Sequence, residues 1–275
     1  MNWKKIIAIA KKDIKEATQN KSVWLPILIV PLIFVVVMPL MMILIFKNPE
    51  LSKSMNNTDI EQLMSVLPEF MKAHVAGMNE IQTMIVLMLG YFFAPFFLML
   101  PLMFSTTIAA ESFAGERERK TIEALLYTPV SDAEMFIGKA LASLIPAVGI
   151  SWASFLGYII VLNAGAYSVI GRIWFPLTNW YPLIFWVSPA ISLLGIAITV
   201  LISAKVQTFM GAYQTSASLV VLVLGILAGQ ATGILALSVS VGLIMGLVLW
   251  LVDAVLLYLA IRSFNRYQLL QTSAA

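Results

Sequence analysis

The chain has 275 residues, of which 60% are hydrophobic and only 11% are charged, and its formal net charge is +3. A soluble domain carries about 25% charged residues, so this chain has too few polar side chains to cover a globule in water, and much of its surface is expected to face lipid. The small net charge, without a run of Lys and Arg interleaved with aromatic residues, argues against nucleic acid as a partner.

Residues 3–17 predict an amphipathic helix on the membrane surface. At about 100° per residue, one arc of this helix is mostly apolar, although Ile9 and Asp13 fit the pattern imperfectly. Lysines flank both sides of the arc, as expected for a helix that lies between lipid headgroups and water. We interpret the segment as an anchor, with contact to a partner protein as the alternative. The arc comprises Trp3, Ile6, Ile7, Ala10, Ile14 and Ala17.

Six later stretches are long and apolar enough to cross a bilayer, which takes about 20 residues. Prolines in the first two are tolerated in a membrane bundle, because neighbouring helices can satisfy the carbonyls that they free. The first stretch is too long for the core of a signal peptide, so we expect it to be retained. Residues 229–240 divide the last two stretches only weakly, and short re-entrant helices are an alternative there. The six stretches are 23–46, 82–109, 136–162, 183–204, 208–229 and 238–261.

These stretches predict an all-α, polytopic integral membrane protein with six transmembrane helices in one transmembrane domain, residues 1–275. Most of the 17 Lys and Arg residues fall on the side that holds both termini, and only Lys47, Lys53, Lys72 and Arg172 fall on the other. Because positively charged loops stay inside, both termini are expected in the cytosol and the chain in the cell membrane.

The same topology assigns the main loops. Residues 1–20 are a cytosolic interfacial segment, 47–81 an external loop and 111–135 a cytosolic loop. Within the external loop, residues 60–75 repeat apolar side chains at helical spacing, and Pro68 is expected to kink or divide that helix. We interpret this helix as a second anchor, with an outer gate as the alternative.

The cytosolic loop holds a disproportionate share of the charges. Thr121 can cap a short helix that follows it, which places Glu123 in the positive first turn. The residue before Pro129 disfavours helix, which ends the element. Leu125 and Leu126 lie on a helix too short to bury them, so they need a partner surface, either the bundle or another protein.

A new helix start follows directly after this short helix. Ser131 and Glu134 have the spacing of a capping box, and Val130 and Met135 are placed for a hydrophobic staple. The loop therefore specifies a short helix, a sharp stop and a fixed entry into the third span.

Four strings of the sequence stand together here: Phe-Ala-Gly-Glu-Arg-Glu at 113–118, Lys-Thr-Ile-Glu-Ala-Leu-Leu at 120–126, Thr-Pro-Val-Ser at 128–131 and Gly-Lys at 138–139. Together they resemble the hallmark of ABC-2 type transporter permeases, whose usual form is close to GERE-x-G-T-L-E-x-L-L-x-T/S-P. Lys120 stands where Gly is common and Ile122 where Leu is common, and both departures are mild. The span layout, the N-terminal helix and the chain length also look like this family, so the resemblance covers nearly the whole chain.

The resemblance implies that residues 121–127 are a coupling helix, which inserts into a cleft of an ATPase subunit and transmits ATP-driven closure to the spans. It also implies a dimer of permeases, identical or different, bound to two copies of a separate ABC ATPase and working as an exporter within membrane lipid. ATP and magnesium would be held by that ATPase, and this chain would hold no cofactor. The residues to which the resemblance assigns coupling are Glu116, Arg117, Glu118, Thr121, Glu123, Leu125, Leu126 and Pro129.

Sequence motifs of an enzyme are missing. A phosphate loop would need Gly before Lys-Thr, and the nearest candidate, from Gly115 to Lys120 and Thr121, lacks it. His74 is the only histidine and cysteine is absent, so disulfides and the usual zinc, haem and thiolate sites are excluded. We therefore expect a transport subunit with no catalytic, metal or cofactor site of its own.

Few polar side chains lie inside the predicted spans. Asp253 is the only carboxylate well inside one, where an ionised group is costly unless it is paired or faces water. Lys139 and Lys205 could reach it, so a structural ion pair is one interpretation and a gating or pathway residue is the other. Tyr213 and Gln214 in the fifth span are candidates for the pathway, with hydrogen bonding between helices as the alternative.

Two further patterns concern packing. Glycines in the last two spans, including Gly225, Gly242 and Gly246, allow helices to approach closely. Aromatic residues gather around the third external loop, and we interpret them as an interfacial belt, with an outer gate or substrate shelf as the alternative. They are Trp174, Phe175, Trp180, Tyr181, Phe185 and Trp186.

Three functions compete. The leading hypothesis is the permease subunit of an ABC exporter, which forms the pathway while a partner hydrolyses ATP. A secondary transporter would need ionisable groups at matched positions in mid-membrane, and only Asp253 qualifies. A membrane scaffold or assembly factor would share the hydropathy but has no need for the short charged helix after the second span.

Overall fold

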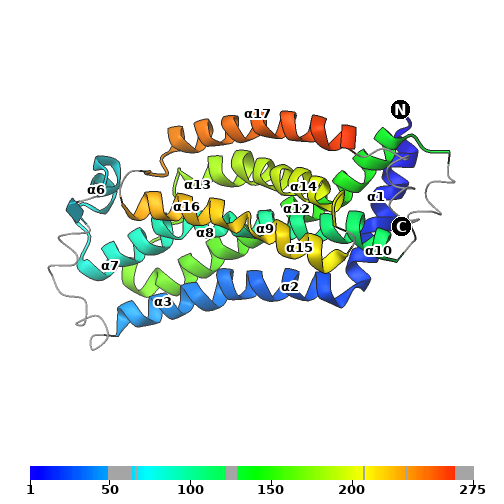
Figure 1. Ribbon diagram of the computed structural model, residues 1–275. Coiled ribbons are helices and arrows are strands. Elements are labelled where there is room, and N and C mark those ends of the chain that lie inside the picture. The colour runs from blue at the N-terminus through cyan, green and yellow to red at the C-terminus, as the bar shows by residue number, and fades with distance from the viewer. Residues whose placement is uncertain are drawn as a thin grey trace.

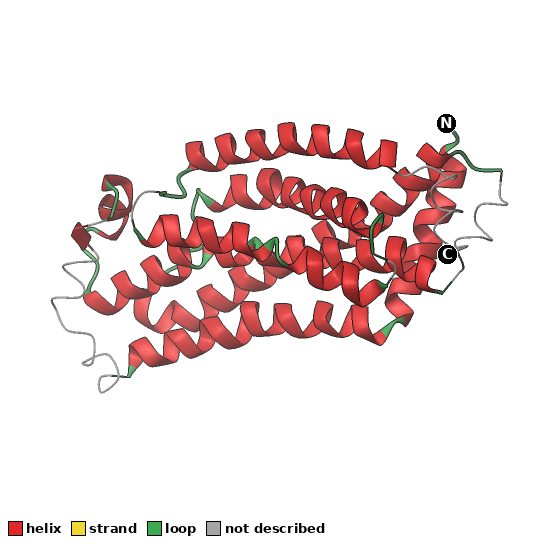
Figure 2. Cartoon of the chain, viewed as in Figure 1, coloured by secondary structure: helices red, strands yellow, loops and turns green. Residues whose placement is uncertain are grey.

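The computed structural model describes residues 1–48, 64–65, 67–119, 121, 129–206, 208–232 and 235–263. These residues form helices and loops without a strand (Figure 2). Six helical stretches are long and apolar enough to cross a membrane, which confirms the prediction of an all-α polytopic membrane protein. In chain order, spans one to six are Lys21–Lys47, Glu80–Glu118, Asp132–Ile170, Trp180–Ser203, Phe209–Ala231 and Val239–Arg262.

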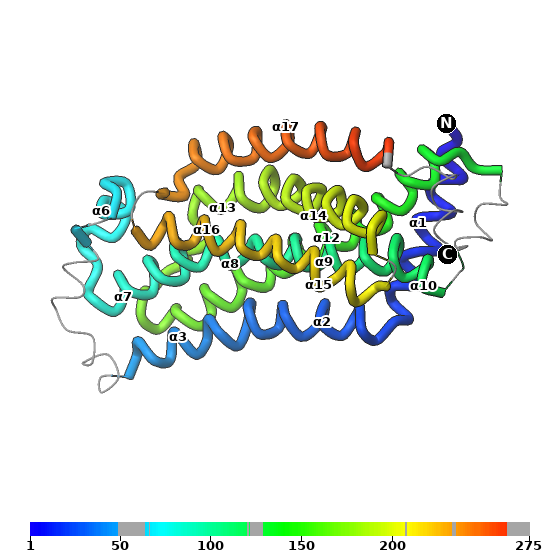
Figure 3. The backbone as a smooth tube through the Cα atoms, viewed as in Figure 1, coloured from blue at the N-terminus to red at the C-terminus, as the bar shows by residue number. Residues whose placement is uncertain are grey.

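The spans run side by side, and two shorter helices lie at opposite ends of the bundle (Figures 1 and 3). Helix α1 (Trp3–Gln19) crosses one end, and α6 (Glu69–Val75) lies at the other. We call the end with α1 the charged end, because ion pairs between α1, span two and span three gather there. The other end is called the opposite end.

Several spans are built from consecutive helical pieces. Span three is the single helix α12 (Asp132–Ile170), and span six is α17 (Val239–Ser263). The others are listed in chain order. Span one comprises α2 (Lys21–Pro31), η1 (Leu32–Val37) and α3 (Met38–Lys47); span two α7 (Glu80–Ile85), η2 (Val86–Phe92), α8 (Ala94–Phe97), α9 (Met99–Ala110), η3 (Glu111–Gly115) and α10 (Glu116–Glu118); span four α13 (Trp180–Pro182), η4 (Leu183–Val187) and α14 (Ser188–Ser203); span five α15 (Phe209–Ala217) and α16 (Val220–Ala231).

Spans two and four form the centre of the bundle. In an apolar 18-residue stretch of each, 78% and 72% of the residues are buried, whereas in spans one, three, five and six the buried share is between 17% and 28%. Helix α9 packs against both α12 and α14, and α14 also packs against α17. The four outer spans therefore carry the large apolar side chains that face lipid or another subunit, as a membrane bundle requires.

The π-helical segments of three spans precede prolines. η1 ends at Val37 shortly before Pro39, and η2 and η4 end in the same way before Pro95 and Pro189. Proline lacks an amide hydrogen and its ring clashes with the carbonyl of the preceding turn, so a wider turn relieves that clash. The sequence thus sets where these helices widen.

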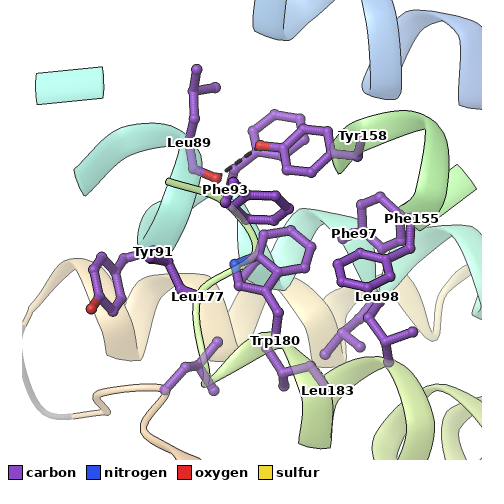
Figure 4. Packing of buried hydrophobic residues seen from close by; sticks show 14 of the residues in the cluster. Leu89, Tyr91, Phe93, Phe97, Leu98, Phe155, Tyr158, Leu177, Trp180 and Leu183 are labelled. Atoms are coloured by element: carbon purple, nitrogen blue, oxygen red, sulfur yellow. Dashed lines mark hydrogen bonds between the residues drawn. The ribbon is translucent and has the colours of Figure 1, made fainter. Parts of the chain in front are cut away.

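Aromatic side chains from three spans fill the core near the opposite end (Figure 4). The Trp180 ring stacks on Phe155, with centroids 5.7 Å apart, and meets the edge of Phe175 at 5.0 Å. Trp180 and Phe175 are buried, so their assignment to an interfacial belt is wrong. Tyr181 and Phe185 are exposed, as a belt facing lipid would be.

Close helix approach at glycine is confirmed for span six. A side chain at Gly246 would overlap the Trp186 ring, and one at Gly242 would lie 3.1 Å from Pro182. Gly225 differs, because a side chain there would meet nothing within 4 Å.

The helix predicted between spans one and two begins at the proline that was expected to kink or divide it. Pro68 precedes the first residue of α6, where its missing amide hydrogen costs no helical bond. Met71 and Val75 are buried on the inner side of this helix. Most of the upstream part of the predicted segment lies outside the described residues.

Candidate functional site

The second span ends at the charged end in a π-helical turn, η3, followed by the single turn α10. These elements carry the Gly-Glu-Arg-Glu string at 115–118. Widened turns of this kind are common at functional sites, because they change which side chains share a face. Here the turn directs Ser112 and Glu116 towards span three.

Lys139 is the centre of a buried group of charges. Its ammonium lies 3.1 Å from the Asp13 carboxylate of α1 and 2.5 Å from the Glu116 carboxylate, and it donates to the Ser112 carbonyl at 2.7 Å. The hydroxyl of Ser112 donates to Asp13. Lys12 forms a second ion pair with Glu116 and lies 3.3 Å from Asp13. We call these five residues the Lys139 cluster.

The charges within the Lys139 cluster balance. Two carboxylates face two ammonium groups, and the side chains of Asp13, Glu116 and Lys139 are almost fully buried. Burial of a charge is costly unless it is paired and hydrogen-bonded, a condition that this arrangement meets. Burial by itself lowers the pKa of Lys12, but the hydrogen bond and charge of Glu116 outweigh it and raise that pKa above its ordinary value.

The next two side chains of the string bind two further elements. Arg117 donates to the Ser203 carbonyl at the end of α14, at 2.6 Å. The Glu118 carboxylate accepts the backbone amide of Phe209 at the start of α15, at 2.8 Å, where a helix N-terminus favours negative charge. Residues 116–118 therefore join four elements: α1, α12, α14 and α15.

An additional ion pair stabilises the turn itself. Arg119 lies 2.7 Å from Glu111, which is eight positions earlier in the chain. A side chain at Gly115 would lie 2.8 Å from the other oxygen of that carboxylate, so the end of the Glu111 side chain would have to shift to admit one.

The stretch after the predicted coupling helix is also bound to α1. Ser131 and Glu134 form the predicted capping box at the start of α12. Glu134 also accepts the Asn2 amide at 2.6 Å, and Lys5 donates to the Pro129 carbonyl. Helix α1 therefore holds both sides of the loop, at the end of span two and at the start of span three.

The predicted coupling helix is only partly covered by the structure. Glu123, Leu125 and Leu126 lie outside the described residues. Thr121 is described, and its amide and hydroxyl both donate to the Glu116 carbonyl, at 3.0 and 3.2 Å. These bonds fix Thr121 against the end of span two, so the segment that follows begins directly from the Lys139 cluster.

Sequence reasoning missed the role of Asp13. Ile6, Ala10 and Ala17 of the predicted apolar arc are buried, but so are Ile9 and Asp13, the two misfits, whereas Trp3 and Ile7 of that arc are 58% and 49% exposed. A lone acidic residue within an otherwise apolar arc was the available signal, because such a residue needs a buried cation.

The suggested partners of Asp253 are corrected as well. Asp253 is 1% exposed, and neither carboxylate oxygen has a hydrogen-bond partner among the described residues. Lys139 is instead bound within its own cluster, and Lys205 is exposed. The sequence could not show this, because it does not reveal which span ends lie together.

Tyr213 and Gln214 lie in different surroundings although they are neighbours in α15. Tyr213 lines an apolar cavity of about 360 Å³ between spans one, two and five, and buried Ser216 lines it with a hydroxyl that has no described partner. Gln214 is exposed on the outer surface of span five. The cavity is lined by Val30, Phe34, Met99, Leu102, Met103, Thr106, Tyr213, Ser216, Ala217 and Val220.

Six membrane-spanning helices around a charged loop junction define a polytopic integral membrane protein. The family model described as ABC-2 family transporter protein matches residues 7–243, so the chain belongs to the ABC-2 transporter family. It is therefore a membrane permease component of an ABC transporter, and the family suggested by the loop motif is confirmed. No curated protein sequence and no solved structure matches the chain.

Proposed function

We propose that this chain forms the export pathway of an ABC transporter and is driven by a separate ATPase through the loop that follows span two. In this proposal the charged end faces the cytosol of the cell, both termini lie there, and residues 121–127 are the helix that the ATPase contacts. Two permease chains, identical or different, would bind two ATPase copies, which hold ATP and magnesium.

The observation that carries the proposal is the set of bonds made by residues 116–118. A force applied just after Thr121 reaches Glu116, Arg117 and Glu118 within a few residues of chain. Those side chains are bonded to α1, α12, α14 and α15, so four elements move when this junction moves. A loop with a purely connecting role would not need buried ion pairs at its base.

The apolar cavity beside Tyr213 supports a pathway within the same chain. It lies between spans one, two and five and contains span-two residues continuous with the charged junction, such as Thr106. A shift of α9, the part of span two that leads to the charged junction, would change the shape of the cavity directly. Tyr213 is therefore our candidate pathway residue, and Asp253, which does not line this cavity, is the less favoured one.

The test is co-purification of the chain with its candidate ATPase, followed by nucleotide hydrolysis in proteoliposomes. The substitutions Glu123→Arg and Leu126→Arg should abolish both association and stimulated hydrolysis, because they place charge at the proposed contact. Arg172→Glu, an exposed charge at the opposite end, is the matched control and should change neither. Unchanged association in the first two variants would remove the coupling assignment.

A second pair of variants separates contact from transmission. Glu118→Ala and Arg117→Ala remove bonds inside the permease and should leave ATPase association intact. Each bond to a charged group contributes about 1.5–3 kcal/mol, so roughly tenfold or greater loss of stimulated hydrolysis is expected. Full stimulation in both variants would show that the junction does not carry the movement.

A further inference from the structure

Span two is interrupted in its middle. Its outer half, α7 and η2, ends at Phe92, and its inner half begins with α9 at Met99. Between them, the turn residues Phe93 and Leu98 flank the single turn α8. The two halves are thus connected by a short break rather than by a continuous helix.

Pro95 removes the amide that would otherwise bond a backbone carbonyl of the preceding turn in this part of span two. The Tyr91 carbonyl would pair with the amide of residue 95 in an α-helix, and the Gly90 carbonyl would do so in a π-helix. Proline has no amide hydrogen, so neither bond can form. Inside a membrane protein such carbonyls need another donor, because water is absent.

Three side chains from three other spans donate to consecutive carbonyls here, two of them to the Gly90 and Tyr91 carbonyls that Pro95 affects. The Tyr158 hydroxyl of α12 donates to the Leu89 carbonyl at 2.8 Å, a bond drawn in Figure 4. The Trp180 indole of α13 donates to the Gly90 carbonyl at 2.6 Å, and the Gln230 amide of α16 donates to the Tyr91 carbonyl at 2.9 Å. All three donors are buried, and we call them the carbonyl caps.

The outer half fits closely into its present position. A side chain at Gly90 would lie 2.7 Å from Leu177, so the loop after span three closes directly over the backbone there. Phe70 of α6 meets the edge of the Tyr91 ring, with centroids 6.0 Å apart. The Gln82 amide donates to the Val169 carbonyl at the end of α12, at 2.9 Å.

The inner half is held in a different way. Helix α9 packs along α12 and α14, and its far end enters the Lys139 cluster through Ser112 and Glu116. Movement of the inner half therefore displaces the charged junction, whereas movement of the outer half replaces side-chain bonds made by other spans and the packing of buried side chains such as Val86 and Leu87.

We propose that residues 93–98 are a hinge and that the carbonyl caps hold the outer half of span two closed against spans three, four and five. Rotation at this hinge alters the few backbone bonds within the segment, such as that from the Leu98 amide to the Pro95 carbonyl, together with the three carbonyl caps. It separates the outer half from the loop over Gly90 and opens the opposite end of the bundle. The hinge is a property of this chain alone and does not depend on coupling to an ATPase.

The absence of cysteine gives a direct test, since single labels need no background substitutions. Spin labels at Glu80→Cys and Arg172→Cys, both exposed, report the distance between the outer half and the loop after span three. A second pair at Lys11→Cys and Lys205→Cys reports the charged end. Distance distributions are measured by pulsed electron resonance on the full chain in lipid nanodiscs.

Tyr158→Phe and Trp180→Phe each remove one cap without removing the aromatic ring. The closed structure should give one distance for the Glu80–Arg172 pair, and each variant should add a longer distance. Loss of one hydrogen bond should raise the ratio of open to closed molecules about fivefold. The two substitutions together should multiply these effects, and the Lys11–Lys205 distance should stay constant.

Trp152→Phe is the matched control, because that indole donates to the Ile184 carbonyl of span four at 3.1 Å and not to span two. Gln230→Leu, in a different span, is an independent variant should a core substitution impair folding. If the cap variants lower the melting temperature while the Glu80–Arg172 pair keeps a single unchanged distance, the bonds are structural only and the hinge is refuted. The same broadening in Trp152→Phe would refute it as well.

Discussion

Substitution of Lys139 by methionine tests the central ion pairs of the charged end. Methionine keeps the length and most of the apolar stem of lysine but removes the ammonium. Lys139 is fully buried and lies 3.1 Å from Asp13 and 2.5 Å from Glu116. Without it, two buried carboxylates share Lys12 as their remaining cation in the cluster.

The expected cost follows from that imbalance. Removing one partner of a buried ion pair destabilises a protein by about 3–5 kcal/mol, because the other charge stays buried and uncompensated. Asp13→Asn added to Lys139→Met leaves Glu116 as the one buried carboxylate of the cluster, facing Lys12, which also pairs with the partly exposed Glu16 at 3.4 Å. The double variant should therefore recover about 2 kcal/mol, within the range of couplings between contacting residues. Lys205→Met, an exposed lysine, is the control and should change stability little.

Unfolding of the purified chain by denaturant titration in mixed micelles measures these differences. Lys139→Met should shift the midpoint strongly, and the double variant should fall between it and the native chain. Strictly additive losses in the double variant would refute the charge-balance argument, because they would show that Asp13 and Lys139 act independently.

Three more outcomes are expected from the same unfolding assay. Gly246→Ala should destabilise the chain by about 1–3 kcal/mol, because the new methyl group overlaps the Trp186 ring. Gly225→Ala is the control and should be close to neutral, since nothing lies within 4 Å of the added methyl group. Equal effects of the two substitutions would contradict the packing described. Asp253→Leu should stabilise the chain by about 1–3 kcal/mol, because neither carboxylate oxygen accepts a hydrogen bond from the described residues. A loss of stability would instead show that Asp253 is paired. The folded-state pKa of Lys12 is raised, so its contribution to stability is fully present below pH 10.5 and is lost as pH rises from 10.5 through the folded-state pKa. The native chain should therefore lose more stability than Lys12→Gln above pH 10.5, and identical curves would contradict this.

Local features of the sequence determined much of this molecule. The length and apolarity of six stretches fixed the spans, since a bilayer accepts little else. The capping box at Ser131 and the widened turns before Pro39 and Pro189 also follow from neighbouring residues alone. The family was visible because its hallmark is a contiguous string.

Long-range contacts were decided only by the tertiary structure. Asp13 and Lys139 are 126 residues apart, and Gln230 and Tyr91 are 139 apart, so no periodicity can relate them. Hydrophobic pattern could not separate the buried Trp180 from the exposed Phe185 either, because both core and lipid accept aromatic rings. In a membrane protein, an apolar side chain can face either lipid or the core, so its apolarity does not tell which. Only the packing of the spans decides which polar groups meet.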